Sequence, residues 1–252
     1  MLTLYFSGTG NSRYVAEHFS EIMKADCFSI EDDINFSDKI SSNDTICFCY
    51  PVYGSCLPII MSEFIDLYRI SLTNKKIIIL CTQHKFSGDG ARVFTDHLKG
   101  IEYQVIYAEH IRMPNNISNL FFYKLECPQE IERFICKADF KIQNICEQIK
   151  KGAVFKRGFN PFSRFLGFIA QRWYFSFIMS RSGKRVKIFD SCNGCSVCVQ
   201  DCPVNNLRLV SKKAEALGQC ILCYRCVNRC PQKAISVMFN TKVRRQYQGI
   251  NC

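Results

Sequence analysis

Two runs of cysteines near the carboxyl end of the chain constrain its fold more than any other feature. The run CNGCSVCVQDCP occupies residues 192–203, and CILCYRCVNRCP follows at 220–231. Every cysteine of the first run has a counterpart at the same offset in the second, from Cys192 and Cys220 to Cys202 and Cys230. An internal repeat of this kind predicts two pseudo-symmetric halves. We therefore expect both halves to place equivalent side chains around equivalent sites.

Each run has the spacing CxxCxxCxxxCP, which is typical of 4Fe-4S clusters. Three thiolates spaced by two residues wrap one face of a cluster, and the fourth, which precedes a proline, reaches the other cluster. CxxC pairs also bind zinc, but all four histidines lie outside this segment, and zinc needs no third cysteine at the same spacing. The predicted ligand sets are Cys192, Cys195 and Cys198 with Cys230, and Cys220, Cys223 and Cys226 with Cys202.

Residues 188–240 resemble the two-cluster bacterial ferredoxins at all of these cysteines. The resemblance implies a small α+β domain that carries two low-potential one-electron centres, close enough to exchange electrons. The segment is basic where such ferredoxins are commonly acidic. Residues 191–252 hold nine Lys and Arg against two acidic residues, but eight thiolates and two oxidised cores would reduce this excess to about +3. The basic charge is therefore weak support for a nucleic-acid partner, which we do not expect.

Residues 1–151 alternate short apolar runs with amphipathic stretches. Continuous apolar runs followed by helices are typical of parallel strands buried on both faces. We predict an α/β fold with a doubly wound, five-stranded parallel sheet, whose ligands bind at the carboxyl ends of the strands near the topological switch point. The apolar runs lie at 2–6, 27–30, 45–50, 76–82 and 103–108, and helices are predicted at 12–24, 58–69, 90–100 and 128–151.

A loop rich in Gly, Ser and Thr follows the first strand and opens a helix. Glycines permit a tight turn, hydroxyls donate to phosphate oxygens, and N–H groups at a helix N-terminus complement a dianion. No Lys follows Gly10, and Arg13 stands where a dinucleotide motif needs its third glycine, so the loop suits a monophosphate. The alternative is a turn that only caps the helix. The predicted contacts are Ser7, Gly8, Thr9, Gly10, Asn11 and Ser12.

This loop resembles the phosphate loop of flavodoxins, (S/T)xTGx(S/T), at all four specified positions. The resemblance implies a flavodoxin-like fold, an FMN cofactor and two further loops around the flavin ring. Tyr53 or Phe86 is a candidate to stack on the ring, although either could be ordinary loop packing. His84 could lie near the ring or could be a solvent-exposed loop residue, and the sequence favours neither. The predicted ring contacts are Pro51, Val52, Tyr53, Gly54, Thr82, Phe86, Gly88 and Asp89.

The layout of the whole chain resembles the bacterial flavodoxin–ferredoxin fusion proteins, and the loop Met113-Pro114-Asn115-Asn116 after the fifth strand is similar to one of theirs. That family places an FMN-binding flavodoxin-like domain first and a two-cluster ferredoxin domain last. The expected domains are 1–151 and 188–252, joined by a basic, aromatic linker helix over 152–187. Nine cysteines lack cluster spacing, and we expect them to be buried thiols.

The linker concentrates positive charge. Residues 150–190 carry ten Lys and Arg against one acidic residue, whereas residues 1–149 carry 14 against 19. A helix is predicted after Asn160-Pro161. It either packs on the flavodoxin-like core or rests its aromatic residues and arginines on a membrane interface or an acidic partner. The apolar stretch at 165–180 is interrupted by Arg172 and is too short to cross a bilayer, which needs about 20 residues.

These features predict an electron-transfer protein that passes single electrons between FMN and two 4Fe-4S clusters, and on to redox partner proteins. The alternative is an FMN-dependent reductase of a small substrate that its own clusters supply with electrons. No dinucleotide motif is present, and His84 and Asp89 are the acid or base candidates near the loops, so we assign no catalytic residue. The start, MLTLYFSGTG, shows no basic segment or cleavage site, and we expect reduced thiols in the cytoplasm.

Overall fold

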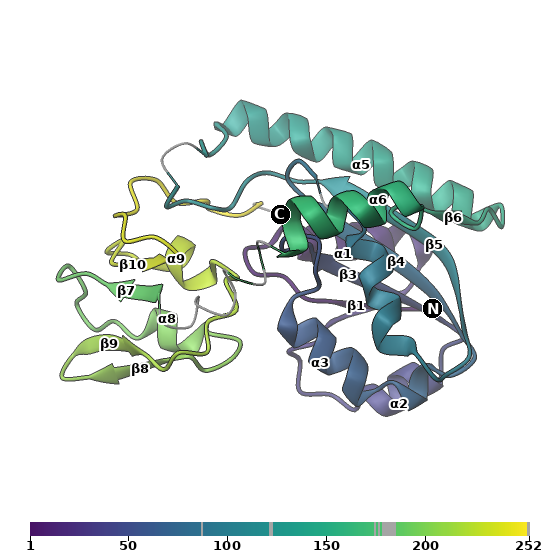
Figure 1. Cartoon of the computed structure of the whole chain (residues 1–252), viewed down its shortest axis with the longest axis horizontal. Coiled ribbons are helices and arrows are strands. Elements are labelled where there is room, and N and C mark those ends of the chain that lie inside the picture. Colours follow the sequence, from purple (N-terminus) through teal and green to yellow (C-terminus); the bar gives the residue numbers. More distant parts are fainter. Residues whose placement is uncertain (87, 121–122, 174, 176, 178–184, 251–252) are drawn as a thin grey trace. The chain divides into compact units, whose positions relative to one another are not determined.

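The computed structural model describes residues 1–86, 88–120, 123–173, 175, 177 and 185–250 (Figure 1). The chain forms two compact units. The first comprises Met1–Ser7, Asn11–Met113 and Glu132–Tyr174, and the second comprises Gly8–Gly10, Pro114–Ile131 and Phe175–Cys252. The domain boundaries expected from the sequence stay a prediction.

The first unit is built on a parallel sheet with the strand order β2-β1-β3-β4-β5-β6. The order of its first five strands is that of the flavodoxin-like doubly wound fold, with the topological switch point between β1 and β3. The predicted α/β class is therefore confirmed. The strands are β1 (Leu2–Tyr5), β2 (Asp26–Ser29), β3 (Thr45–Pro51), β4 (Lys75–Gln83), β5 (Tyr103–Arg112) and β6 (Phe155–Lys156).

The sequence predicted five strands, and the sixth is a correction. Phe155 and Lys156 of β6 pair with Tyr107 and Ala108 of β5. Two exposed residues in a basic segment carry no apolar periodicity, so no sequence pattern indicated this strand.

The central strands explain why the sheet is buried on both faces. In β3 the side chains from Ile46 to Tyr50 are all buried, and in β4 those from Ile77 to Thr82 are buried. Helices cover the sheet in Figure 1, and Phe94 packs its ring 4.7 Å from that of Phe48. Continuous apolar strands of this kind require a cover on each side.

Most helices lie where the periodicity predicted them. The stretch at 90–100 differs, because it is a four-residue helix followed by a 3-10 turn. The helix α2 was not predicted. The helices of this part are α1 (Asn11–Met23), α2 (Phe36–Ser41), α3 (Ile59–Leu67), η1 (Ile70–Leu72), α4 (Gly90–Val93), η2 (Phe94–Leu98) and α5 (Pro128–Lys150).

The linker helix begins at the predicted Asn-Pro signal. Asn160 is the N-cap, and its side-chain oxygen accepts a hydrogen bond from the backbone N–H of Ser163 at 2.7 Å. Pro161 opens α6 (Pro161–Leu166), which continues as the π-helix η3 (Gly167–Arg172). No helix in the described part of the chain is both long enough and apolar enough to cross a bilayer.

The second unit preserves the internal repeat in its backbone. Helix α8 (Val197–Gln200) corresponds to α9 (Arg225–Arg229), and β8 (Leu207–Val210) corresponds to β10 (Ile235–Val237). Ser196 and Tyr224, at equivalent positions of the repeat, precede these helices with nearly equal left-handed φ angles of 62° and 61°. Strand β10 pairs with β7 (Val186–Ile188), and β8 pairs with β9 (Lys213–Ala216), both antiparallel.

The cysteines without cluster spacing only partly follow the prediction. Cys47, Cys49, Cys81 and Cys146 are buried, but Cys136 is exposed on α5. Cys252 lies outside the described residues. The prediction of a buried thiol is wrong for Cys136, because it occupies a solvent-facing position of an amphipathic helix.

Candidate cofactor sites

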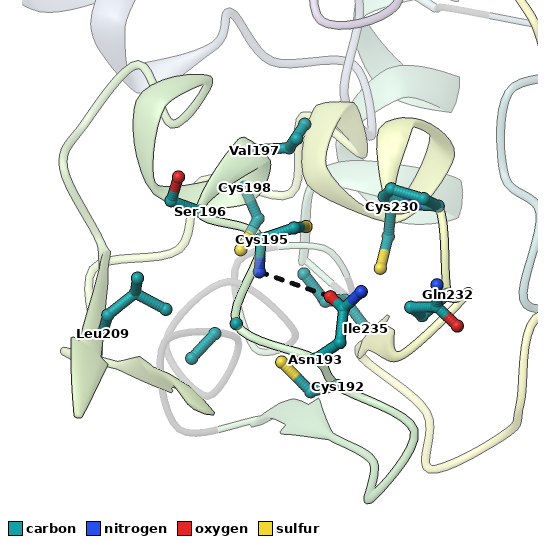
Figure 2. A pocket seen from close by; sticks show the side chains of 13 residues that line it. Cys192, Asn193, Cys195, Ser196, Val197, Cys198, Leu209, Cys230, Gln232 and Ile235 are labelled. Carbon is teal, nitrogen blue, oxygen red and sulfur yellow. Dashed lines mark hydrogen bonds between the residues drawn. The ribbon is translucent and has the colours of Figure 1, made fainter. Parts of the chain in front are cut away.

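The first cavity of the second unit is lined by Cys192, Cys195, Cys198 and Cys230 (Figure 2). The first three cysteines come from the loop that leads into α8 and from its first turn, and the fourth follows α9. Apolar side chains complete the wall, namely Val197, Leu209, Ala214 and Ile235. Three cysteines of one repeat thus meet the last cysteine of the other.

The second cavity repeats this arrangement in the other half. It is lined by Cys202, Cys220, Cys223 and Cys226, and is otherwise bounded largely by apolar residues. The structure therefore brings the eight predicted ligands together in the two crossed sets, each around its own space.

Each crossing cysteine is held by a backbone N–H group. The N–H of Asn206 donates to the sulfur of Cys202 at 3.2 Å, and that of Ala234 donates to the sulfur of Cys230 at 3.3 Å. The two donors again occupy equivalent positions of the repeat. Hydrogen bonds to ligand sulfurs stabilise the thiolate and tune the reduction potential of a cluster.

Burial makes these thiols weak acids. Burial is the largest cause, and together with the neighbouring cysteines it raises the pKa of Cys223 to about 12 and that of Cys198 to about 11. Burial also raises the pKa of Cys226 well above its usual range. Because a metal ligand is the thiolate, iron must displace these protons when it binds.

A single zinc ion and a 4Fe-4S cluster place different demands on four cysteines. Zinc requires its ligand atoms to meet about 2.3 Å from one centre. The thiolates of a 4Fe-4S cluster bind different iron atoms, so they surround a space instead of meeting at a point.

Ser12, one of the predicted phosphate contacts, lies in the first unit, in the first turn of α1. Its hydroxyl is buried and lies 2.6 Å from that of Thr82, at the end of β4. Two residues that the sequence assigned to different loops therefore share a hydrogen bond. The first N–H groups of a helix make no bond within the helix, and an anion at this end can accept them.

The remaining part of the loop, Gly8–Gly10, belongs to the second unit. Gly10 has a φ of +99°, which a residue with a side chain rarely adopts. The Thr9 hydroxyl accepts a hydrogen bond from the side chain of Asn116 at 2.8 Å. Asn116 in turn accepts, at its backbone oxygen, a bond from the Asn228 side chain at 2.9 Å. The sequence marked Asn116 as part of a loop motif but did not predict these contacts.

Gly8 is required for a close backbone approach inside the second unit. A Cβ at this position would lie 2.3 Å from the carbonyl oxygen of Cys223. The Arg225 side chain donates to the Gly8 carbonyl oxygen at 3.3 Å. Sequence reasoning missed Arg225, because a contact between positions so far apart in the chain has no local pattern.

The first predicted ring loop is a tight turn after β3. The Val52 N–H donates to the Thr82 carbonyl oxygen at 3.0 Å, which joins this loop to β4. Tyr53 and Cys56 exchange two backbone hydrogen bonds of 3.0 Å, and Gly54 between them has a φ of +56°. Pro51, Val52, Tyr53 and Gly54 therefore lie together at the carboxyl edge of the sheet.

The second predicted ring loop, after β4, is held by a buried ion pair. Asp89 is fully buried and pairs with Arg92 at 2.8 Å and with Arg172 of η3. Gly167 of the same helix packs so closely that a Cβ on it would meet the Asp89 carboxylate. The linker helix therefore packs on the flavodoxin-like core, which was the first of the two predicted alternatives.

The other candidates of this loop have different environments. Phe86 is half exposed, and His84 lies with its ring 5.7 Å from that of Phe134 on α5. Gly88 has a φ of +51° and abuts Gly167. Ser87 lies outside the described residues. Ring contacts from these residues stay a prediction.

Two family models match the chain at opposite ends. Residues 2–113 match the model of a flavodoxin domain, and residues 191–235 match that of a 4Fe-4S dicluster domain. The chain is a flavodoxin–ferredoxin fusion. Its flavodoxin domain implies FMN, its dicluster domain implies two 4Fe-4S clusters, and together they support a role in electron transfer. No curated protein matches the chain.

Solved structures are similar to the flavodoxin part of this fusion protein. The two-electron reduced flavodoxin of Megasphaera elsdenii is 24% identical and covers 44% of this chain and 85% of its own, with a TM-score of 0.38. The oxidised flavodoxin 2 of Bacillus cereus is 14% identical and covers 58% and 97%, with a TM-score of 0.40. The Trp repressor binding protein of Bacillus subtilis is 13% identical and covers 62% and 99%, with a TM-score of 0.43.

The residues present fit both kinds of cofactor. The phosphate end of FMN needs hydroxyl and N–H donors at a helix N-terminus, and in the first unit Ser12 and the first N–H groups of α1 supply these. Each cluster needs four thiolates in an apolar cavity, and each quartet of cysteines lines one.

Pairs of cysteine substitutions can test the crossed ligand sets. Cys202→Ala with Cys220→Ala removes two ligands from one set, so we expect one intact cluster to remain. Cys202→Ala with Cys192→Ala removes one ligand from each set, so we expect no cluster with four thiolates. The measurements are the iron content and the electron paramagnetic resonance spectrum of the reduced protein. The opposite pattern would mean that each cluster takes all four ligands from one run.

The phosphate-loop prediction can be tested at Ser12. Ser12→Ala removes a hydroxyl that would bond to a charged phosphate, and such bonds contribute about 1.5–3 kcal/mol. We expect FMN to bind roughly 10- to 100-fold more weakly, as measured by flavin fluorescence titration. Ser20→Ala is the matched control, because Ser20 also lies on α1 and bonds to a buried hydroxyl, that of Thr3, at 2.7 Å. Equal FMN affinities in the two variants would mean that the loop only caps the helix.

Proposed function

We propose that this fusion protein passes single electrons between FMN in its flavodoxin domain and the two 4Fe-4S clusters of its dicluster domain, and on to redox partner proteins. The observation that carries the proposal is the presence of eight cysteines in two crossed quartets on the same chain as a flavodoxin domain. Bound FMN supplies exchange of one or two electrons and each cluster supplies exchange of one, so the two kinds of centre are chemically compatible.

The residues of the dicluster part have a positioning and tuning role in this proposal. The cysteines fix each cluster in an apolar cavity, and the N–H groups of Asn206 and Ala234 lower the electron density on the crossing thiolates. The side chains of Leu209 and Ile235 limit the access of water to the first cavity. These contacts set the potential at which the protein holds an electron.

The residues of the flavodoxin part bind and orient the flavin in the same proposal. The Ser12 hydroxyl, which lies against that of the predicted ring contact Thr82, would bind the phosphate, and the turn from Pro51 to Gly54 lies at the edge of the sheet where a flavin ring would be held. Gly54 and Gly88 adopt left-handed backbone angles that keep these loops close to the sheet.

The burial of Asp89 weighs against the alternative of a substrate reductase. A reductase of this kind needs a proton donor near the ring, and the sequence offered His84 and Asp89 for this role. The Asp89 carboxylate is fully buried and paired with two arginines. Its carboxylate oxygens contact the two guanidinium groups and are closed off from solvent, so they are not presented to a substrate above the ring.

The dependence of the rate on protein concentration tests the proposal. We expect flash reduction of the flavin under anaerobic conditions to be followed by bleaching of the cluster absorbance in the intact protein. Because the centres share one chain, the rate constant should stay unchanged over a tenfold dilution series. A rate proportional to protein concentration would contradict the internal transfer, and it would mean that the two domains serve different partners.

A further inference from the structure

A row of apolar side chains is exposed along the linker helix. Phe162, Phe165, Ile169 and Trp173 follow one another at intervals of three and four residues, which makes them neighbours on a helix surface. Their exposed fractions are 70%, 61%, 56% and 73%. Phe168 beside them is 55% exposed. We call these five residues the exposed apolar face.

The opposite side of this helix is fixed to the first unit. Gly167 is buried against the loop after β4, where a Cβ would lie 3.1 Å from the backbone nitrogen of Asp89 as well as against its carboxylate. Arg172 forms an ion pair with the fully buried Asp89. This anchoring prevents the helix from rotating its aromatic residues inward. The exposed apolar face is therefore a consequence of how the helix is attached.

The segment that carries this face is rich in positive charge. Residues 150–173 contain six Lys and Arg and no acidic residue. Arg157 and Arg172 pair with buried carboxylates of the first unit. The four others are exposed to solvent and carry charge at the surface: Lys150, Lys151, Lys156 and Arg164.

The segment that precedes the helix in the sequence has a similar composition. Val154 and Phe155 are 62% and 42% exposed, and they precede Lys156 and Arg157 in and around β6. Aromatic and aliphatic side chains interleaved with Lys and Arg are typical of helices and segments that lie in the plane of a membrane interface. Trp in particular favours the level of the lipid headgroups.

We propose that the exposed apolar face binds the surface of an anionic lipid bilayer. The apolar side chains would enter the interface between headgroups and acyl chains, while the four exposed basic side chains contact anionic headgroups. An acidic protein could match the charge, but it would need a groove shaped to four separate aromatic rings. A bilayer accommodates the same residues without a shape requirement.

Trp173 gives a direct test, because it is the only tryptophan in the chain. The protein with its cofactors is mixed with phosphatidylcholine vesicles that contain or lack phosphatidylglycerol. We expect the tryptophan emission to shift to shorter wavelength, and brominated lipids to quench it, with the anionic vesicles only. We also expect added salt to reverse both effects, because it screens the basic residues. Emission that anionic vesicles leave unchanged would overturn the proposal, and so would emission already typical of a buried tryptophan before vesicles are added.

Substitutions locate the binding surface. Phe162→Ser with Phe165→Ser should weaken partitioning to anionic vesicles about tenfold or more, since two large apolar side chains no longer enter the interface. Phe140→Ser on α5 is the matched control, because Phe140 is 73% exposed, as Trp173 is. FMN and iron contents should stay unchanged in both variants. An equal loss of vesicle binding in the two variants, or no loss in either variant, would contradict the proposed binding surface. A change in sedimentation behaviour without vesicle binding would assign the face to a second copy of the chain.

Discussion

The crossing of one cysteine from each repeat into the cavity of the other is the constraint on which the second unit depends. Each cavity takes three cysteines from one run and the fourth from the other run. Neither half can complete its site alone, so binding of one cluster orders residues in both halves. The free energy of metal binding then becomes folding free energy for the whole unit. This agrees with the few secondary-structure elements of the described residues 185–250, which are four short strands in two pairs and two short helices, α8 and α9.

A second constraint, the buried Asp89, organises the first unit at the carboxyl edge of its sheet. A carboxylate with no exposed surface is costly unless it is paired, and here Arg92 and Arg172 pair with it from two different helices. Removing either arginine would leave a less compensated buried charge. The ion pair therefore fixes the linker helix on the predicted ring loop, and this attachment leaves the helix's aromatic residues exposed.

How much the sequence could predict depended on whether the signal was local. The cysteine quartets were predictable because their spacing alone indicates their chemistry. The strands β3 and β4 were predictable because they are continuous apolar runs. The strand β6 was missed because two exposed residues show no hydrophobic periodicity. The helix α2 was missed because six residues are too few to show one. The pairing of Asp89 with Arg172 and the bonds of Asn116 to Thr9 and Asn228 join positions far apart in the chain and depend on tertiary placement. No local pattern encodes such contacts.

The cofactors that the cysteine quartets and the phosphate loop bind decide the function proposed for this protein. Anaerobic purification followed by metal, sulfide and flavin analysis of the same sample measures them. Two quartets of thiolates and one loop for a monophosphate predict about eight iron atoms and eight sulfides, with roughly one FMN, per chain. Zinc in place of iron would contradict the assignment of the quartets, and FAD in place of FMN would contradict that of the loop.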